Sequence, residues 1–471
     1  MAPQSHGAPG VPRRPRGVRR AGPRRHGRCA VCRDAGRRGS VARRPPQRPD
    51  SPRRARRAPR GLHRAAGARS AGARGRRRPD ARTGAGMKVL FLAHSFPRYI
   101  TDPVGSFVLR LAAALRAAGV EVTVLAPSAP GLARRESFEG VPVERFRYAP
   151  RRLETLAYTA TMRPRVQRSW AARLTLASFL VAQLVAALRL RRRFRWDLVH
   201  AHWWMPGGLV GTRLGAPLVT TLHGSDLRLA QDVPIAARLF RYVVRRSAVV
   251  TTVSRWLAQG TAALVPDVRP VVAPMPIKGD LFHPGGARPP ARLLFVGKLN
   301  EQKGVGHVLR ALARMRCPAT LDIVVGVGSV EDEARALAAS LGIAERLRWH
   351  PLLPQAELAD LYRSVTALVM PAVDEGFGLV AVEALLCETP VVAFASGGLT
   401  DIVVHEETGL LVPAGDGDAL AAALDRLLAL PDRGAALAQA GRRRALALFG
   451  PEAAARRYAE LYRTALDRAG R

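Results

Sequence analysis

From Met87 to the C-terminus, short apolar runs alternate with longer segments whose apolar residues recur every three or four positions. The short runs are continuously apolar, which is typical of strands buried on both faces of a parallel sheet. The longer segments, such as 106–118 and 233–246, have the period of helices that cover such a sheet. In the first half of this region the expected strands are residues 88–93, 121–126, 197–201, 217–222 and 248–253.

The alternation is interrupted at residues 274–290, where Pro and Gly are too frequent for a regular element. A second β/α series follows the interruption, with expected strands at 292–296, 320–325, 347–350, 367–370 and 390–393 and expected helices at 418–430 and from 451. The pattern predicts two Rossmann-like, doubly wound parallel-sheet domains. Ligands in such sheets bind beyond the carboxyl ends of the strands, so the site is expected in a cleft between the two domains.

The predicted organisation has five parts. We expect a disordered extension, a first Rossmann-like domain, a linker, a second Rossmann-like domain, and a C-terminal helix that packs back on the first domain. Their predicted boundaries are 1–86, 87–273, 274–290, 291–450 and 451–471.

The net charge of +39 is concentrated at the N-terminus. Residues 1–86 hold 26 Arg against 3 Asp, or +23, which leaves 39 − 23 = +16 for the remainder. This segment has almost no aromatic or aliphatic residues, so it is expected to be disordered. A basic arm for nucleic acid or an anionic membrane is one interpretation, but it lacks interleaved aromatic residues for base stacking. We favour an extension without function upstream of a native start at Met87, and no specific nucleic-acid partner.

The four cysteines do not indicate a metal site. Cys29 and Cys32 form a lone CxxC without the second ligand pair that zinc requires. Cys317 and Cys387 lie among apolar residues and are predicted to be core thiols of a protein in a reducing compartment. We therefore expect no metal, and a cytoplasmic location.

The apolar segment Leu174–Leu190 is shorter than the roughly 20 residues that a membrane span needs, and Gln183 interrupts it. A buried or surface-docked amphipathic helix is expected instead. Beside it, Arg189–Arg195 and the remaining positive charge suggest peripheral contact with the anionic inner face of a membrane. A solvated basic surface explains the same residues equally well.

A basic turn, residues 297–304, follows the first strand of the second domain and opens a helix. Lys298 and Lys303 bracket the turn, and Gly304 permits the backbone to approach an anion at the helix N-terminus. Two ammonium groups and free N–H donors suit a diphosphate. A solvated basic loop remains the alternative.

A glycine-rich acidic turn follows the strand at 367–370. Glu375 lies in this turn, and Glu383 follows eight positions later, near the same face of the expected helix at 378–386. Two carboxylates at this spacing could accept hydrogen bonds from hydroxyls at both ends of one ligand. Two surface glutamates are the alternative, but Glu383 lies in an otherwise apolar helix, where a carboxylate needs a partner.

Two further positions at strand ends are candidates. His223 directly follows the strand at 217–222 and could face the cleft, although a structural histidine is at least as plausible; Ser225 and Asp226 could cap the next turn. Gly105 ends the loop after the first strand, where it fits either a close approach to a ligand or a helix N-cap.

Other nucleotide motifs are lacking. The sequence contains no GxxxxGK[ST], and the first strand is not followed by GxGxxG. Gly326 and Gly328 form the nearest dinucleotide-like fragment but lack the third glycine. Asp416 and Asp418 precede a helix, so a turn with an N-cap is expected there in place of a metal pair.

Taken together, these pieces resemble the retaining glycosyltransferases of the GT-B fold, in the large group called family 4. The most specific part is the element in which Glu375 and Glu383 are separated by seven residues. The other matching segments occur in the expected order: 221–226, 297–304, the double glycine 397–398 and 408–413. The resemblance covers nearly all of 87–471. It implies that the first domain, 87–273, lies on the acceptor side and that the second, 291–450, binds the nucleotide-sugar.

The resemblance implies roles for individual residues. Lys298 and Lys303 would hold the diphosphate of a nucleotide-sugar donor. The family more often has Arg at the first of these positions; Lys298 keeps the charge but lacks the bidentate guanidinium fork. Glu383 would accept the ribose hydroxyls, and Glu375 the hydroxyls of the transferred sugar. The other implied contacts are the backbone from Gly376 through Phe377 and Gly378 to Leu379 for sugar and phosphate, His223 near the sugar, and Gly105 at the diphosphate or acceptor.

Two positions depart from the family pattern. Glu388 stands where glycine is usual, and Asp401 replaces a usual Glu after the double glycine. Both put local packing in doubt, not activity.

The implied activity is transfer of a hexose from a UDP- or GDP-sugar to a hydroxyl of a glycan, lipid or small molecule, without a cofactor. The alternatives are a non-catalytic nucleotide-sugar-binding protein and an epimerase or hydrolase on the same fold. The sequence does not distinguish the sugars or the acceptors.

Overall fold

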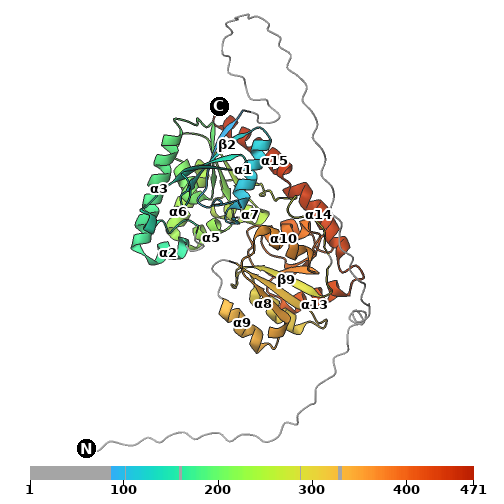
Figure 1. Cartoon of the computed structure of the whole chain (residues 1–471). Helices are drawn as coiled ribbons and strands as arrows, with labels where there is room; N and C mark the ends of the chain where they lie inside the picture. The colour runs from blue at the N-terminus through green and yellow to red at the C-terminus, as the bar shows by residue number, and fades with distance from the viewer. Residues whose placement is uncertain (1–85, 101, 159–161, 287, 327–330, 471) are drawn as a thin grey trace, which may run out of the picture. The chain divides into compact units, whose positions relative to one another are not determined.

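The computed structural model describes residues 86–100, 102–158, 162–286, 288–326 and 331–470 (Figure 1). The predictions for the N-terminal extension, for Cys29 and Cys32 and for Gly328 lie outside these residues.

The first sheet has eight strands in the order β3-β4-β2-β1-β5-β6-β7-β8. All neighbours pair in parallel except β3 and β4, which form an antiparallel edge. The strand bounds are β1 Lys88–Leu92, β2 Glu121–Pro127, β3 Arg135–Phe138, β4 Val141–Phe146, β5 Leu198–His202, β6 Leu218–Leu222, β7 Val249–Thr252 and β8 Val271–Val272.

The second sheet has six strands, all parallel, in the order β11-β10-β9-β12-β13-β14. Its strands are β9 Arg292–Gly297, β10 Thr320–Val325, β11 Leu347–His350, β12 Ala367–Met370, β13 Val391–Phe394 and β14 Leu410–Val412. The prediction of two doubly wound parallel-sheet domains is confirmed.

Helices connect the strands and cover both faces of each sheet (Figure 1). Those of the first half are α1 Ser106–Ala117, α2 Met162–Arg168, α3 Trp170–Leu190, α4 Leu209–Gly211, α5 Ser225–Asp232, α6 Pro234–Arg246 and α7 Arg255–Leu264, with the short turns η2 Arg151–Leu153 and η3 Trp204–Gly208. Those of the second half are α8 Val305–Arg314, α9 Glu331–Ser340, α10 Gln355–Arg363, α11 Leu379–Leu386, α12 Leu399–Ile402, α13 Gly417–Ala429, α14 Ala435–Phe449 and α15 Pro451–Arg468, with η4 Ala344–Arg346.

Alternate residues of the central strands point to opposite faces of the sheet, as the pleat requires. In β1, Val89 and Phe91 join the larger core, whereas Leu90 and Leu92 join a smaller core beneath α3. Burial on both faces explains why the sequence of this strand is continuously apolar.

The C-terminal helix α15 contacts α1 and the strands β5, β6 and β7 of the first sheet. Tyr458 and Tyr462 are fully buried there, and Tyr458 Oη donates to the carbonyl of Ala273 (2.9 Å). A helix that follows the second sheet in sequence therefore completes the core of the first.

Several elements were not predicted. The edge strand β3 and its neighbour β4 contain alternating exposed and less exposed residues, so they lack the continuous apolar run that marks a central strand. The strands β8 and β14 have two and three residues, too few for a pattern. Helix α14 is rich in Ala and Arg and was also missed.

Three local predictions are confirmed. Cys317 and Cys387 are buried. The side chain of Asp416 caps α13 by accepting a hydrogen bond from Ala419 N (2.8 Å).

Helix α3 differs from its prediction. Among the described residues, it alone is long and apolar enough to cross a membrane. It is not amphipathic, because apolar residues including Leu174 and Val181 also occupy its outward side.

Candidate functional site

The basic turn connects β9 to α8. Gly304 has φ 74°, and a Cβ there would lie 2.1 Å from the carbonyl oxygen of Pro371, so only glycine fits this approach. Asn300 Oδ1 accepts a hydrogen bond from Lys303 N (2.9 Å) and fixes the turn. The pKa of Lys298 is lowered, mainly by burial and to a smaller extent by the positive charge of the neighbouring Lys303. The two lysines thus lie close enough to repel, an arrangement that an anion would relieve.

The acidic turn connects β12 to α11, and Glu375 is buried within it. The double glycine packs beneath its backbone: a Cβ on Gly397 would lie 2.3 Å from Glu375 O, and Gly398 N donates to the same oxygen (2.7 Å). The two glycines are therefore required by the close approach of two loops. A side chain at Gly397 or Gly398 would clash with the backbone of the acidic turn, which explains why the family motif has two glycines there.

Lys303 and Glu375 form an ion pair through Nζ and Oε2. The two residues come from different strand-end loops, 72 positions apart. The structure therefore brings a cation suited to phosphate beside a carboxylate suited to hydroxyls.

The next residues of the acidic turn present backbone. Gly378 has φ 106° and starts α11, and Leu379 is its first helical residue. The Phe377 side chain is buried against Phe449, with ring centroids 5.2 Å apart, so only its backbone could face a ligand.

Glu383 is buried in α11 and does not lie in solvent. Tyr362 Oη donates to its Oε2 (3.3 Å), and Arg110 of α1 lies 4.0 Å from its Oε1. Burial raises the pKa of Glu383 to about 7, while Arg110 and Tyr362 act in the opposite direction. The carboxylate thus has the partners that its apolar helix called for.

His223 follows β6 and approaches the acidic turn. A Cβ on Gly376 would lie 2.6 Å from His223 O, and one on Gly224 would lie 3.1 Å from Gly376 Cα. Ser254 Oγ, at the start of α7, donates to Gly376 O (2.7 Å). The loops carrying His223 and Glu375 are therefore in contact.

Asp226 organises the His223 loop from beneath. Its buried carboxylate accepts hydrogen bonds from the backbone N–H of Gly224 (2.8 Å), Leu227 (3.0 Å) and His223 (3.2 Å). Burial raises its pKa to about 6 against these hydrogen bonds. The suggestion that Ser225 and Asp226 cap the next turn is wrong: the N-cap of α5 is Gly224, without a side-chain cap hydrogen bond, and Asp226 lies inside the helix, where its carboxylate binds the N–H groups of the preceding loop.

Four histidines gather at the carboxyl ends of β1, β5 and β6. His202 Nδ1 lies 3.2 Å from His223 Nε2, and the ring of His200 lies beside that of His202, tilted by 34° with centroids 4.3 Å apart. His94 contacts the ring of Trp203. The pKa of His223 lies well below its usual value, mainly because the ring is buried and to a smaller extent because His202 and His94 are close to it. His223 is therefore a neutral group at neutral pH.

Gly105 precedes α1 with φ 72°, and a Cβ there would lie 2.4 Å from Ser95 O. Two residues later, the Phe107 ring lies 5.0 Å from that of His223. Gly105 thus shapes a loop beside His223, and its own surroundings are backbone.

Five residues of this region were not assigned to the site from the sequence: Arg110, His202, Asp226, Ser254 and Tyr362. Arg110 was detectable in principle, because an arginine on the apolar face of a helix needs an acidic partner. The others come from strand ends or helices with no distinctive spacing.

The two departures from the family pattern have local explanations. Glu388 has φ 56°, in the left-handed region that favours glycine. Asp401 pairs with Arg255, through Arg255 Nε (2.6 Å) and backbone N (2.6 Å). Neither residue lies among the strand-end loops described above.

Family models match both halves of the chain. Residues 283–444 match glycosyl transferases group 1, and residues 104–276 match a glycosyl transferase 4-like domain. A D-inositol 3-phosphate glycosyltransferase of Thermobispora bispora is 37% identical over 314 residues, which are 59% of this chain and 72% of the relative.

A second relative and a solved structure agree. A 2-deoxystreptamine glucosyltransferase of Streptomyces kanamyceticus is 31% identical over 368 residues, 71% of this chain and 92% of the relative. A sucrose-phosphate synthase of Thermosynechococcus elongatus superposes with a TM-score of 0.68 at 25% identity, covering 80% of this chain and 98% of that one.

Proposed function

The chain belongs to the family of glycosyl transferases group 1, and on this premise we propose that it transfers a sugar from a nucleotide-diphosphate donor, UDP- or GDP-linked, with retention of the anomeric configuration. The ion pair of Lys303 with Glu375 carries the proposal. It joins, at one point, the group that a diphosphate needs and the group that sugar hydroxyls need.

The diphosphate gains negative charge as its bond to the anomeric carbon breaks. Lys298, Lys303 and the N–H groups that open α8 and α11 would stabilise this charge. These groups supply the positive charge without a metal, so we propose that no cofactor takes part.

Donor binding would rearrange the ion pair. A diphosphate held between the two lysines competes for the Lys303 ammonium, which leaves the Glu375 carboxylate available to the hydroxyls of the sugar. Glu383 would accept hydrogen bonds from the ribose, and neutral His223 would lie at the sugar. The contact between His223 O and Gly376 keeps the two loops in register.

The proposed reaction exchanges one bond at the anomeric carbon for another. The bond to the diphosphate oxygen breaks and a bond to the acceptor oxygen forms on the same face. The acceptor hydroxyl gives its proton to an oxygen of the leaving diphosphate, so no carboxylate nucleophile is needed.

The acceptor is proposed to be a hydroxyl of a small polyol, a glycan or a lipid. The two relatives act, by their names, on D-inositol 3-phosphate and 2-deoxystreptamine. Both are six-membered carbon rings with several hydroxyls, which favours a ring polyol as the first acceptor to try.

Two other functions fit the same fold. One is binding of a nucleotide-sugar without transfer, and the other is epimerisation or hydrolysis. The presence of Lys298, Lys303, Glu375 and Glu383 together favours transfer over both.

The test is a panel of UDP- and GDP-sugars incubated with the purified chain and each of the two ring polyols, with product detected by mass. Lys303→Ala is expected to lower turnover about 100- to 1,000-fold, the usual effect of removing one preorganised donor. Lys88→Ala is the control, because Lys88 pairs with Glu121 on the surface. Normal turnover by Lys303→Ala would contradict the proposal; donor binding without product would favour the binding protein.

We also place the protein in the cytoplasm, in peripheral contact with the anionic inner face of a membrane. The arginine-rich segment Arg189–Arg195, at the end of α3, supports this membrane contact.

A further inference from the structure

Helix α3 exposes apolar side chains on the side that faces away from the sheet. Its inward side, with Phe179 and Ala187, is buried in the smaller core. Outward, the exposed fractions are 73% for Trp170, 61% for Leu174 and 61% for Val181. A surface helix that is apolar all round leaves a face that favours an apolar partner.

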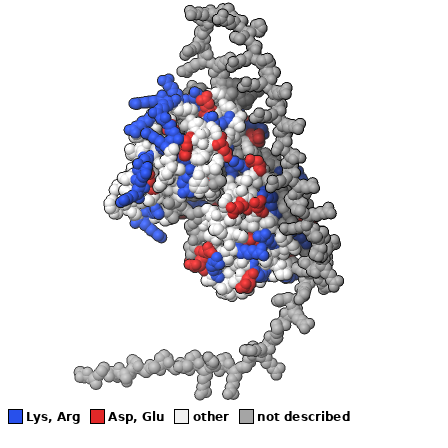
Figure 2. Space-filling model, in the orientation of Figure 1, with Lys and Arg blue, Asp and Glu red and all other residues white. Residues whose placement is uncertain are grey.

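Every charged residue in and around this helix is basic. Residues 155–196 contain nine Arg and no Asp or Glu. Figure 2 shows Lys and Arg gathered on this part of the surface. An apolar face whose flanking sequence carries only positive charge matches an anionic lipid surface, in which phosphates lie just outside the acyl chains.

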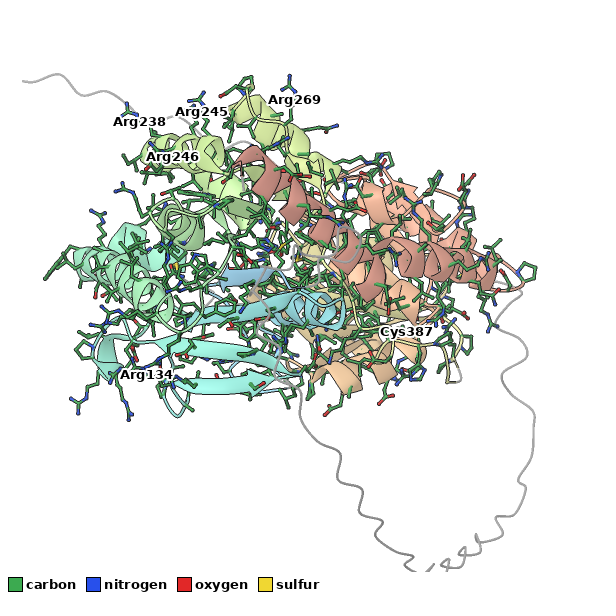
Figure 3. All side chains as sticks on the ribbon, turned by 90° about the horizontal axis from the view of Figure 1, so that it is seen from above. Arg134, Arg238, Arg245, Arg246, Arg269 and Cys387 are labelled. Atoms are coloured by element: carbon green, nitrogen blue, oxygen red, sulfur yellow. The ribbon has the colours of Figure 1, made fainter. Side chains whose placement is uncertain are left out.

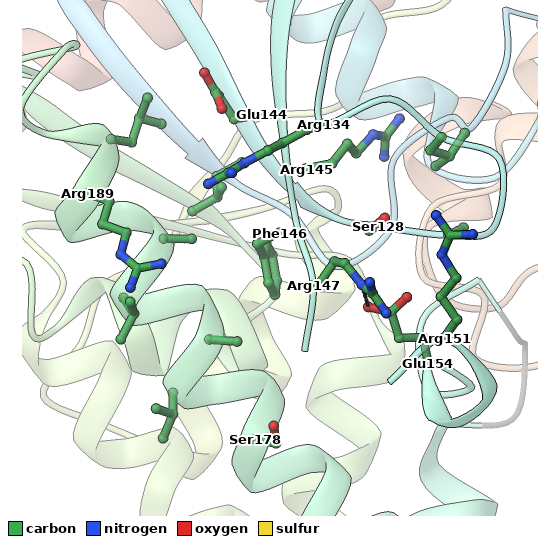
Figure 4. A pocket seen from close by; sticks show the side chains of 18 of the residues that line it. Ser128, Arg134, Glu144, Arg145, Phe146, Arg147, Arg151, Glu154, Ser178 and Arg189 are labelled. Carbon is green, nitrogen blue, oxygen red and sulfur yellow. Dashed lines mark ion pairs between the residues drawn. The ribbon is translucent and has the colours of Figure 1, made fainter. Parts of the chain in front are cut away.

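A groove of about 870 Å³ runs between α3 and β4. Its walls are apolar at Phe146, Val181 and Val185, and arginines stand at both ends (Figure 4). Arg134 and Arg189 lie at one end and Arg147 and Arg151 at the other. None of the candidate site residues lines it.

Most of the arginines in this groove keep their charge available. The two acidic groups are already paired, Glu144 with Arg135 (2.9 Å) and Glu154 with Arg147 (3.6 Å). In the described part of the chain, no ion pair involves the remaining surface arginines of the groove, which are Arg134, Arg151, Arg189, Arg192 and Arg193. Guanidinium groups bind phosphate oxygens strongly and with defined geometry.

We propose that α3 and this groove dock the protein on an anionic phospholipid bilayer, with the outward side chains of α3 in the interface and a lipid phosphate between the groove arginines. Because α3 packs one side against β2 and β4, it lies along the membrane surface and does not cross the bilayer. This inference specifies the surface of the proposed membrane contact and does not depend on sugar transfer.

The chain contains its own reporter for this contact. Of its six tryptophans only Trp170 is exposed, and it opens α3. Brominated lipids quench a tryptophan that enters the acyl region. With the full chain and vesicles of brominated phosphatidylglycerol we expect quenching that Trp170→Phe abolishes, and no quenching with brominated phosphatidylcholine.

Two variants test the surface. Arg189→Glu with Arg193→Glu, and separately Val181→Asp, are expected to weaken vesicle partitioning about tenfold or more, since one basic side chain at an anionic surface accounts for about fivefold. The matched control is Arg238→Glu with Arg246→Glu, two exposed arginines of α6 in the same half of the chain (Figure 3).

The proposal fails if Trp170 is not quenched, or if the control loses as much partitioning as the groove variant. It also fails if the vesicle-bound chain resists extraction by high salt and carbonate, which would indicate a crossing helix. A self-association that Val181→Asp abolishes, without quenching, would assign the surface to a second copy. Transfer to a soluble acceptor is measured in parallel, so a failure of docking is separable from a failure of catalysis.

Discussion

Arg110 of α1 and Glu383 of α11 face each other across 273 positions of sequence, with Nη1 4.0 Å from Oε1 and both side chains buried. Arg110 Nη2 also donates to Gln355 Oε1 (2.9 Å) at the start of α10. Arg110, from the first half of the chain, therefore contacts two groups of the second half: the Glu383 carboxylate, which we propose binds the ribose, and Gln355 of the neighbouring helix α10. Burial raises the pKa of Glu383 to about 7, and Arg110 limits the rise.

Donor binding is therefore expected to depend on pH. Glu383 accepts two ribose hydroxyls only as a carboxylate, so donor affinity should fall as pH falls through about 7. Arg110→Gln removes the charge that favours the carboxylate and should move this limb to higher pH, whereas Glu383→Gln should bind weakly at every pH. Calorimetric titration of donor from pH 5.5 to 8.5 measures this. An affinity independent of pH in the unchanged protein would contradict the proposed role.

The same carboxyl group should affect folding in the opposite direction from a salt-bridged acid. A pKa raised from 4.5 to about 7 means that the native state holds its proton more tightly than the unfolded state. Stability contributed by the protonated form is complete below pH 4.5 and is lost as pH rises to about 7. Glu383→Gln should therefore unfold at a temperature that changes less between pH 5 and 7.5 than that of the unchanged protein.

Gly304→Ala should be severe for a steric reason. Its Cβ would lie 2.1 Å from Pro371 O, so the basic turn and the end of β12 must separate. We expect a loss of at least several degrees in melting temperature and a larger loss of donor affinity. Gly342→Ala is the matched control, because its φ of 68° is similar but nothing lies within 4 Å of the added carbon. Equal effects of the two variants would show that strain in φ, and not the contact, is responsible.

Much of the fold followed from the periodicity, because strands buried on both faces leave largely apolar runs. Ten of the fourteen strands in the described residues were predicted in this way. Edge strands such as β3 are half-exposed and carry a weaker signal. The site was predictable to the extent that it consists of strand-end loops: Lys303 and Glu375 were named and are in contact. Arg110 was not named, because pairing across the two halves depends on tertiary packing that no local pattern encodes.

Asp226 should be a positioning residue for His223. Asp226→Ala removes an acceptor from three backbone N–H groups of a buried loop, at about 1–3 kcal/mol for each donor left without a partner. Asp226→Asn retains one oxygen and should recover part of the loss. Melting curves measure the stability of each variant, and steady-state kinetics measure its donor KM and kcat. A displaced loop raises KM, whereas general unfolding lowers the active fraction, and with it kcat, without changing KM. Unchanged stability and KM in Asp226→Ala would contradict the role.

The last prediction concerns the attachment of α15 to the first sheet. Tyr462 Oη lies 2.7 Å from His200 Nδ1, and His200 Nε2 lies 2.6 Å from Thr221 Oγ1, so a buried chain of polar groups links the C-terminal helix to β5 and β6. Tyr462→Phe leaves Nδ1 without this partner and should cost about 1–3 kcal/mol of unfolding free energy. Tyr99→Phe, at an exposed site, should change stability by less than about 0.5 kcal/mol. Denaturant unfolding measures both variants. Because the ring of His200 contacts that of His202 and His202 contacts His223, Tyr462→Phe should also alter the NMR shifts of the His223 ring. If stability falls while those shifts stay unchanged, α15 supports the core alone and not the site.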